Sequence, residues 1–233
     1  MPVLKYIPVL FLLLFQSCVV AEARLQEAYA PATVNMTLKR ISEHVWFVEG
    51  APGIATENQG FISNAGVIVT GAGVVVFDAL GTPSLADLLL KKIRAITSEP
   101  VVRLIVSHYH ADHIYGLQVF DALDAEILAP AGAATYLESA NARERLTERR
   151  FTLDPWVNEQ TRLVVPSQYL EEGMQFRLGD VDFTVTVVGK AHSDGDLTLY
   201  VAPDRVLFSG DVIFEGRVPF LGDSNTRNWV AVL

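Results

Sequence analysis

The chain has 233 residues, a formal net charge of -9 at pH 7 and a single cysteine. An acidic protein of this kind is a poor partner for nucleic acid and for anionic membranes. A single cysteine also excludes a disulfide bond within the chain.

The first 23 residues predict a signal peptide. Lys5 precedes an apolar run at residues 9–15, and Ala21-Glu22-Ala23 has the small-x-small pattern of a signal-peptidase site. The run is short for a transmembrane helix, so an uncleaved anchor is the weaker alternative. Phe15-Gln16-Ser17-Cys18 is similar to an imperfect lipoprotein box, which makes lipid attachment at Cys18 a second alternative. We expect an exported protein, periplasmic or secreted, whose mature domain is not inserted in the membrane.

Residues 34–233 predict one domain that begins with β structure and then alternates strands with helices. A helix capped by Ser84 is expected to end before Pro100. Strands are predicted near residues 45–48, 66–70, 74–78, 101–106, 126–129, 161–165, 174–177, 183–188, 197–201 and 206–208, and helices near residues 84–97, 116–123, 131–150 and 225–233. This order favours a layered α/β sandwich over an all-β barrel.

The segment Ser107-His108-Tyr109-His110-Ala111-Asp112-His113 follows an apolar strand and is dense in metal-binding side chains. His108 and His110 leave the strand in extended chain, where residues two apart point to the same side, so they can share one metal. Asp112 and His113 follow at the beginning of a short helix, which would direct them to a second point a few Å away. A surface loop that is rich in histidine by chance is the alternative. The clustering of four of the five histidines favours a metal centre with two adjacent ions.

Two further ligand candidates follow predicted strands in the second half of the chain. His192 lies in a polar, glycine-rich loop and can complete a three-imidazole site with His108 and His110. Asp211 follows a buried strand and a glycine, where a carboxylate is costly unless it is paired or bound to a metal. A turn residue that caps backbone amides is the alternative for Asp211. The fifth histidine, His44, is interpreted as structural.

The order His108-x-His110-x-Asp112-His113, then His192, then Ser209-Gly210-Asp211, resembles the metallo-β-lactamase-fold superfamily. The resemblance implies an α/β fold, a four-layer αβ/βα sandwich with the metals at one edge of its two sheets. It further implies that His108, His110 and His192 hold one zinc, that Asp112, His113 and Asp211 hold a second, and that Asp211 bridges them. Asp78 corresponds to a residue that supports the metal loop in this family.

The family also uses a last histidine on a later loop, and this chain has none after His192. The sequence ends at Leu233 inside a predicted helix. We therefore expect a chain truncated at its C-terminus, with the last elements of the fold missing and the second metal one ligand short.

The resemblance implies a hydrolase that uses a metal-bound hydroxide on a small-molecule ester, thioester, lactone or amide, with Asp112 as the catalytic residue that orients the hydroxide. Dedicated β-lactamases of this fold usually have cysteine or serine where this chain has Asp211, so a glyoxalase II-like or exported metallohydrolase type is favoured. A periplasmic metallo-β-lactamase is one alternative, and a non-catalytic metal- or partner-binding protein with an incomplete site is another. Iron and manganese suit the same ligands as zinc. The sequence does not indicate an oligomeric state.

Overall fold

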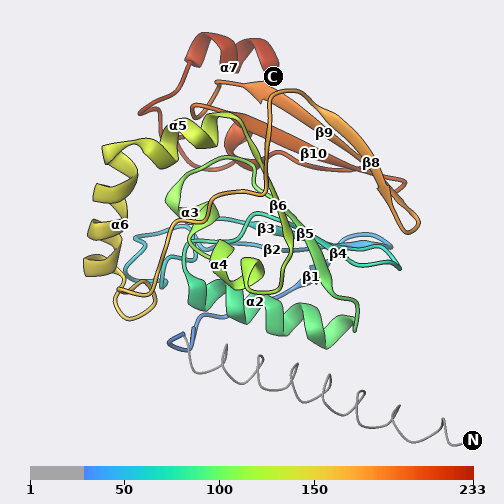
Figure 1. Ribbon diagram of the computed structural model, residues 1–233, viewed down its shortest axis with the longest axis horizontal. Helices are drawn as coiled ribbons and strands as arrows, with labels where there is room; N and C mark the ends of the chain where they lie inside the picture. Colours follow the sequence, from blue (N-terminus) through green and yellow to red (C-terminus); the bar gives the residue numbers. More distant parts are fainter. Residues whose placement is uncertain (1–28) are drawn as a thin grey trace, which may run out of the picture.

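Two β-sheets lie face to face in the computed structural model, which describes residues 29–233 (Figure 1). The predicted signal peptide at residues 1–23 and Cys18 lie outside the described residues. The larger sheet has seven strands in sequential order: β1 (Lys39–Arg40), β2 (Val45–Val48), β3 (Ala65–Val69), β4 (Val74–Phe77), β5 (Val101–Ile105), β6 (Glu126–Pro130) and β7 (Gln168–Leu170). The smaller sheet has the order β11 (Val206–Phe208), β10 (Asp196–Ala202), β9 (Val181–Gly189) and β8 (Met174–Leu178).

The helices cover the outer faces and one end of this pair of sheets. They are α2 (Pro83–Ile96), α3 (Ala111–Ile114), α4 (Leu117–Asp121), α5 (Gly132–Glu138), α6 (Ala140–Thr152), the 3₁₀ turn η1 (Gly210–Val212) and α7 (Thr226–Val232). Figure 1 shows α2 and α4 on the outer side of the larger sheet and α7 beyond the smaller one. The predicted four-layer α/β sandwich is therefore confirmed. No helix within residues 29–233 has the length and apolar character needed to cross a bilayer.

The larger sheet is buried on both faces because its central strands carry apolar residues at consecutive positions. In β4, Val74 and Val76 pack in the cluster on the helix side, whereas Val75 and Phe77 pack in the cluster between the sheets. The smaller sheet contributes alternate residues to that second cluster, including Phe183 and Leu199. Residues two apart on a strand share a face, so strands β2 to β7 of the larger sheet supply both cores, whereas the exposed β1 supplies neither.

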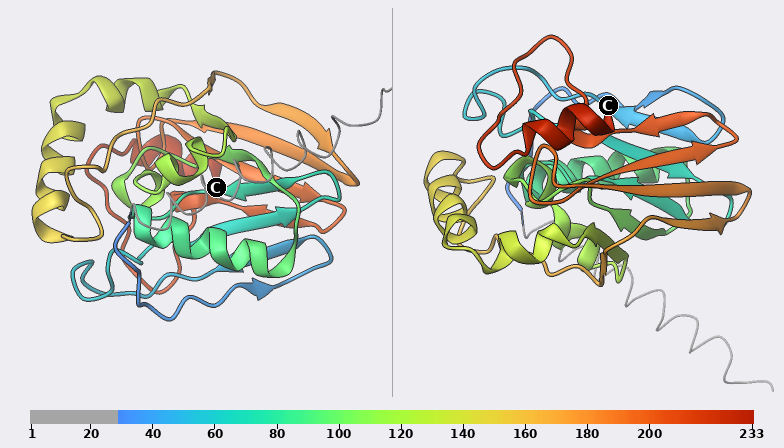
Figure 2. Two further views of the ribbon diagram at one scale, coloured as in Figure 1. Left: turned by 60° about the horizontal axis from the view of Figure 1, so that its bottom comes forward. Right: turned by 90° about the horizontal axis from the view of Figure 1, so that it is seen from above.

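Strands β4 and β5 are parallel, so their carboxyl ends meet at the same edge of the sheet. The smaller sheet reaches the same edge: the Leu197 amide near the start of β10 donates to the Ser107 carbonyl at 3.0 Å, and Gly210, in the turn after β11, lies against the Ser107 side chain. The two turned views in Figure 2 place α5 and α6 at the same end of the sandwich as the loop that precedes α7. This end therefore gathers segments from both halves of the chain.

Three local predictions were wrong. Thr82, not Ser84, caps α2: its hydroxyl accepts a hydrogen bond from the Leu85 amide at 3.1 Å, and Pro83, which has no N–H, takes the first helical position. Residues 131–150 form two helices because extended backbone at Ser139 separates α5 from α6.

The segment at residues 161–165 is not a strand, because side chains bind its backbone. The Val164 carbonyl accepts from the Tyr109 hydroxyl at 2.8 Å, the Thr161 carbonyl accepts from Arg150 at 2.8 Å, and the Arg162 amide donates to Gln118 at 2.9 Å. These bonds take the place of a strand partner.

Candidate metal centre

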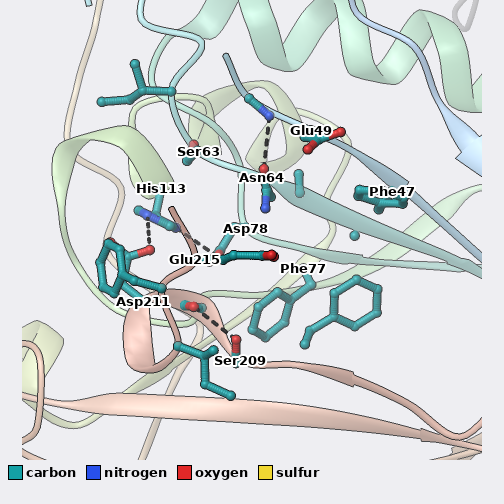
Figure 3. Close-up of a pocket in the computed structure, with 18 of the residues that line it drawn as sticks. Phe47, Glu49, Ser63, Asn64, Phe77, Asp78, His113, Ser209, Asp211 and Glu215 are labelled. Carbon is teal, nitrogen blue, oxygen red and sulfur yellow. Dashed lines mark hydrogen bonds and ion pairs between the residues drawn. The ribbon is translucent and has the colours of Figure 1, made fainter. Parts of the chain in front are cut away.

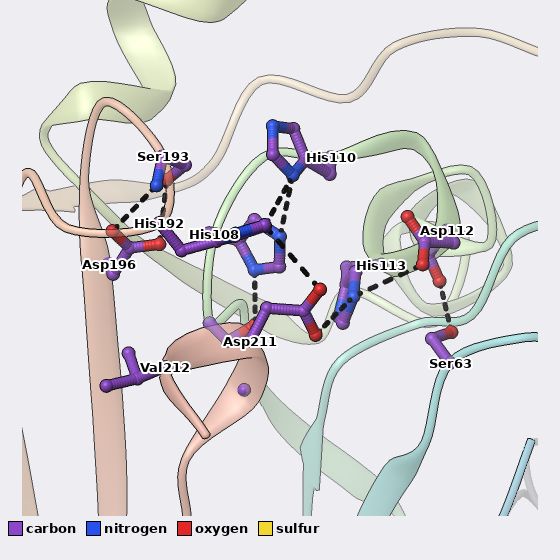
Figure 4. A network of polar contacts seen from close by, with 12 residues as sticks. Ser63, His108, His110, Asp112, His113, His192, Ser193, Asp196, Asp211 and Val212 are labelled. Atoms are coloured by element: carbon purple, nitrogen blue, oxygen red, sulfur yellow. Dashed lines mark hydrogen bonds and ion pairs between the residues drawn. The ribbon is translucent and has the colours of Figure 1, made fainter. Parts of the chain in front are cut away.

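Three imidazole rings converge at the edge where β5 ends. His108 Nε2 and His192 Nε2 each lie 3.0 Å from His110 Nδ1 (Figure 4). Zn–N bonds of about 2.0–2.1 Å in a tetrahedron place two nitrogens roughly 3.3 Å apart. Two of the three separations are thus close to the spacing that one zinc ion requires, and the ligand atoms of all three rings lie within 4.8 Å of one another.

Ser107 determines which nitrogen of His108 faces the other rings. The Ser107 hydroxyl donates to Asp78 Oδ2 at 2.8 Å and lies 2.9 Å from His108 Nδ1. A hydroxyl that donates to a carboxylate accepts from Nδ1–H, which leaves His108 Nε2 unprotonated. This is the form in which an imidazole nitrogen binds a metal.

His113 begins a second group of ligand atoms. Its Nδ1 donates to the buried Asp78 carboxylate at 2.9 Å, so its Nε2 is turned toward two other carboxylates. Asp211 Oδ1 and Asp112 Oδ2 lie 3.4 and 3.5 Å from this nitrogen. These separations exceed those of charge-assisted hydrogen bonds and suit atoms that share one cation.

Asp211 lies between the two groups. Its Oδ1 faces His113 Nε2, and its Oδ2 is 3.5 Å from His192 Nε2 (Figure 4). One carboxylate therefore lies between the two groups of potential ligand atoms, as the bridging hypothesis requires. Gly210 makes this approach possible: its φ is +52°, and an added Cβ would lie 2.4 Å from the Ser107 side chain.

The donor set fits zinc. His108, His110 and His192 form one compact group of potential ligand atoms, and His108, His113 and Asp211 form another. His113 Nε2, the nitrogen that faces Asp112 and Asp211, is a buried atom without a close hydrogen-bond partner among the described residues. Neutral imidazoles with carboxylates are typical of hydrolytic zinc centres, and iron or manganese suits the same atoms. Asp112 lies beside the second group rather than within it.

The three imidazoles of the first group favour the neutral form. Burial, with the neighbouring His113 next in importance, lowers the pKa of His108 well below its ordinary value. Burial and His192 lower the pKa of His110, and burial lowers the pKa of His192. Neutral rings are ready to bind a metal without first losing a proton.

In the second group, by contrast, neighbouring carboxylates favour the protonated form of the imidazole. Burial alone would lower the pKa of His113, but the carboxylates of Asp112, Asp78 and Asp211 raise it well above its ordinary value. Burial would raise the pKa of Asp112, yet His113 and then His110 hold it far below the usual range. The negative charge that stabilises a proton on His113 is also what a divalent cation needs.

The loop that carries His192 is organised by Asp196, whose role the sequence did not reveal. This buried carboxylate accepts from the Ala191 amide at 3.0 Å, the Ser193 amide at 2.9 Å and the Ser193 hydroxyl at 2.8 Å. Trp229 of α7 packs against the His192 ring at 5.3 Å between centroids. The sequence does contain one signal for this role, because Asp196 is a carboxylate at the first position of a buried strand.

His44 does not belong to the centre, as expected. Its Nδ1 lies 2.9 Å from Asp204 Oδ2, and its amide donates to Asp204 Oδ1 at 3.0 Å. The pair joins the turn between β1 and β2 to the turn between β10 and β11, whereas the metal centre lies at the other ends of these strands.

Two pockets reach the candidate centre. One, of about 880 Å³, is lined by Asp78, His113 and Asp211 together with aromatic rings such as Phe77 (Figure 3). The other, of about 360 Å³, is lined by His110, Asp112 and His192 and by residues of α6 and of the loop before α7. Both groups of ligand atoms are therefore accessible to small molecules.

A family model described as the metallo-beta-lactamase superfamily matches residues 58–232. The chain is 33% identical over 132 residues to an acyl-coenzyme A thioesterase, MBLAC2 of Gallus gallus, covering 54% of this chain and 47% of that protein. It is 25% identical over 176 residues to metallo-beta-lactamase type 2 of Elizabethkingia meningoseptica, covering 72% of this chain and 61% of that protein. The chain thus spans about half to three fifths of the length of these relatives.

Solved structures show the same fold at low sequence identity. A metallo-beta-lactamase from Pontibacter korlensis has a TM-score of 0.65 at 17% identity, covering 84% of this chain and 81% of that chain. A double mutant of the sec-alkyl sulfatase PisA1 has a TM-score of 0.64 at 19% identity, covering 91% of this chain and 39% of that chain.

Proposed function

This chain belongs to the metallo-β-lactamase superfamily, and we propose that it is a zinc-dependent hydrolase whose substrate is an acyl thioester or ester. The observation that carries the proposal is the sharing of ligands between two groups of atoms. His108 belongs to both groups, and the two oxygens of Asp211 face His113 and His192. His108 has only Nε2 available and can bind one ion, but a carboxylate whose two oxygens face both groups favours two adjacent ions over one isolated structural ion.

The proposed ligands are His108, His110 and His192 for one zinc, and Asp112, His113 and Asp211 for the other. Bound zinc would supply an activated water and would polarise the acyl carbonyl of the substrate. The resident side chains position the reaction: His110, Asp112 and His192 line one pocket, so a carbonyl bound there lies beside the centre.

Asp112 is the proposed catalytic residue. Its carboxylate is ionised because its pKa is held far below the usual range, so it accepts a hydrogen bond from the attacking water and orients it. Its backbone carbonyl accepts a hydrogen bond from the Ser63 hydroxyl, which fixes the first turn of α3. Asp112 is thereby held at the pocket wall.

Similarity to an acyl-coenzyme A thioesterase at 33% identity favours a thioester substrate. Hydrolysis of β-lactams is the second candidate, because a metallo-beta-lactamase is 25% identical over a longer stretch. A non-catalytic metal-binding protein is the alternative of another class, and it predicts zinc binding without turnover.

The test is zinc analysis of the full 233-residue chain together with a panel of acyl-coenzyme A, aryl ester, lactone and nitrocefin substrates. We expect bound zinc and turnover that is greatest with a thioester or ester. His110→Ala should abolish turnover, and His44→Ala, a histidine outside the centre, should retain it. Zinc binding without turnover of any substrate would support the non-catalytic alternative. Turnover unchanged in His110→Ala would contradict the proposed centre.

A further inference from the structure

The pocket of about 360 Å³ is lined by arginines from two separate segments. Arg145 and Arg149 belong to α6, and Arg217 belongs to the loop before α7, while His110 and Asp112 line the same pocket. We propose that this pocket selects substrates that carry an anionic group, a phosphate or a carboxylate, and that Arg145 and Arg149 bind that group. The inference rests on the proposed function, because it places the acyl bond of the same substrate at the metal centre.

The arrangement on α6 presents one polar face to the pocket. Asn141, Arg145 and Arg149 recur every fourth residue, so they lie on the same side of the helix, and all three line the pocket. Two arginines four residues apart repel each other and lower the stability of the helix. Folding of α6 therefore does not account for this pair, whereas recognition of an anion does.

The partners of these arginines leave them free to bind a ligand. Arg145 Nη1 is 2.7 Å from Glu148 Oε2, and both side chains are substantially exposed, so this ion pair is weak and exchangeable. Arg149 forms no ion pair within residues 29–233, and its electrostatic neighbours include the phenols of Tyr115 and Tyr136. Arg217 lies over the Phe214 ring at 5.0 Å.

Arg150, the next residue on α6, is an arginine with a structural role. Arg150 donates to the carbonyls of Asn158 and Thr161 at 3.0 and 2.8 Å and so fixes the segment that follows α6. Arg149 has no such bonds to the backbone, although it is also half-buried. The two neighbours thus have different surroundings, and only Arg149 lines the pocket.

The charged residues that line the pocket also support the proposed anion site. The whole chain carries a net charge of -9, yet three arginines meet at this one pocket. The carboxylates of Asp112, Asp211 and Asp223 also line it, but none of them forms an ion pair with Arg145 or Arg149. The planar guanidinium fork matches the oxygens of a carboxylate or phosphate and can bind two of them at once.

The pocket connects this cationic wall to the ligand residues of the metal centre. His110 and Asp112 lie on its wall together with the α6 arginines, so one molecule can contact both. A volume of about 360 Å³ is within the range of small-molecule sites. The pocket therefore selects a small molecule whose anionic group contacts the arginines while its acyl bond lies at the metal centre.

The test compares three non-hydrolysable thioethers by titration calorimetry on the zinc-loaded 233-residue chain. S-hexyl-coenzyme A supplies phosphates, S-hexyl-3-mercaptopropionate supplies a carboxylate, and S-hexyl-pantetheine is uncharged. We expect at least one charged ligand to bind more tightly than the uncharged one. Whichever charged ligand is preferred identifies the anionic group.

Variants of α6 then test whether Arg145 and Arg149 cause the preference for a charged ligand. Arg145→Gln and Arg149→Gln should each weaken binding of the preferred charged ligand by about tenfold or more, as expected for the loss of a charged hydrogen bond. Arg149→Lys should recover part of the affinity, because it retains the charge without the fork. Arg143→Gln is the matched control: this exposed arginine of the same helix donates to the Glu138 carbonyl and does not line the pocket. Thermal melting and zinc content verify that each variant folds.

Unchanged binding of charged ligands in the double variant Arg145→Gln, Arg149→Gln would overturn the inference. So would an equal loss of affinity for S-hexyl-pantetheine, or an equal effect of Arg143→Gln. Binding of these thioethers needs no turnover. Charge-selective binding without hydrolysis of any substrate would therefore count against the proposed function and leave the anion site standing.

Discussion

Asp78 Oδ2 accepts a hydrogen bond from His113 Nδ1 at 2.9 Å, and both side chains are buried. The same oxygen accepts from the Ser107 hydroxyl at 2.8 Å, and Asp78 Oδ1 accepts from the Ser107 amide at 2.7 Å. One carboxylate at the end of β4 therefore fixes both the beginning and the end of the histidine loop. The Asp78 backbone has a φ of +66°, a conformation that aspartate adopts more readily than most residues.

Asp78→Asn should weaken zinc binding by roughly 10–100-fold, the usual effect of losing a carboxylate that orients a ligating histidine. The amide keeps the size of the side chain but not its charge. Its single oxygen cannot replace both carboxylate oxygens, one of which accepts from His113 and the other from the Ser107 amide. Competition with a chromogenic zinc chelator measures the change.

Asp204→Asn is the matched control, because Asp204 is another buried aspartate bonded to a histidine at 2.9 Å. It should leave zinc affinity unchanged. Equal zinc affinities of Asp78→Asn and the wild type would show that Asp78 has no part in the centre.

Asp211→Asn should lower the zinc content of the protein from two ions toward one. The oxygens of Asp211 face His113 and His192, so the second group loses charge while the three imidazoles of the first group remain. Elemental analysis after dialysis against trace zinc gives the stoichiometry. Asp223→Asn changes a carboxylate of the neighbouring pocket and should retain two ions. Two ions retained in Asp211→Asn would rule out the bridging role.

The proximity of His108 and His110 could be predicted from the sequence because it is local. His108 and His110 are two apart at a strand end, and the structure brings them together with His192. The roles of Ser107 and Asp196 could not be predicted in the same way. Each depends on hydrogen bonds that form only after distant segments or a folded loop place donors around it.

The same reason accounts for the strand that was wrongly predicted at residues 161–165. Its composition suits a strand, but the Tyr109 hydroxyl and the Arg150 guanidinium, which come from other elements, bind its carbonyls. Propensity describes what a segment prefers in isolation, and tertiary partners override it. Strands β2 to β6 of the larger sheet were predictable because burial leaves apolar runs in them. The two-residue β1, which is exposed, and the three-residue β7 were not predicted, because neither has such a run.

Gly210→Ala should lower zinc affinity even though residue 210 binds no metal. The new Cβ would meet Ser107 Cβ at 2.4 Å and Ser107 Oγ at 2.7 Å, and φ at this position is +52°. Either Ser107, which contacts His108, or the turn that carries Asp211 must move. Gly216→Ala is the control, since it also has a positive φ but has nothing within 4 Å of an added Cβ. Equal zinc affinities of the two variants would show that the contact with Ser107 is unimportant.

Asp204 should make the stability of the fold depend on pH. Burial alone would raise the pKa of Asp204, but its contacts with Ser42 and His44 hold it below the ordinary value. A lowered pKa in the folded state means that the ionised carboxylate stabilises the fold. This contribution is present above the ordinary aspartate pKa of about 3.9 and is lost as the pH falls through the lowered value.

Urea unfolding of metal-free wild type and Asp204→Asn at several pH values between 7 and about 2.5 tests this account. The variant should be less stable near neutral pH, because an amide replaces a buried carboxylate bonded to His44. The difference in unfolding free energy should begin to shrink below a pH of about 4, where Asp204 takes up a proton in the unfolded wild-type chain, and should be smallest below the lowered pKa of the folded state. The carboxylates of the metal centre titrate in both proteins, so the difference isolates Asp204. A difference that stays constant down to the lowest pH would show that ionisation of Asp204 does not stabilise the fold.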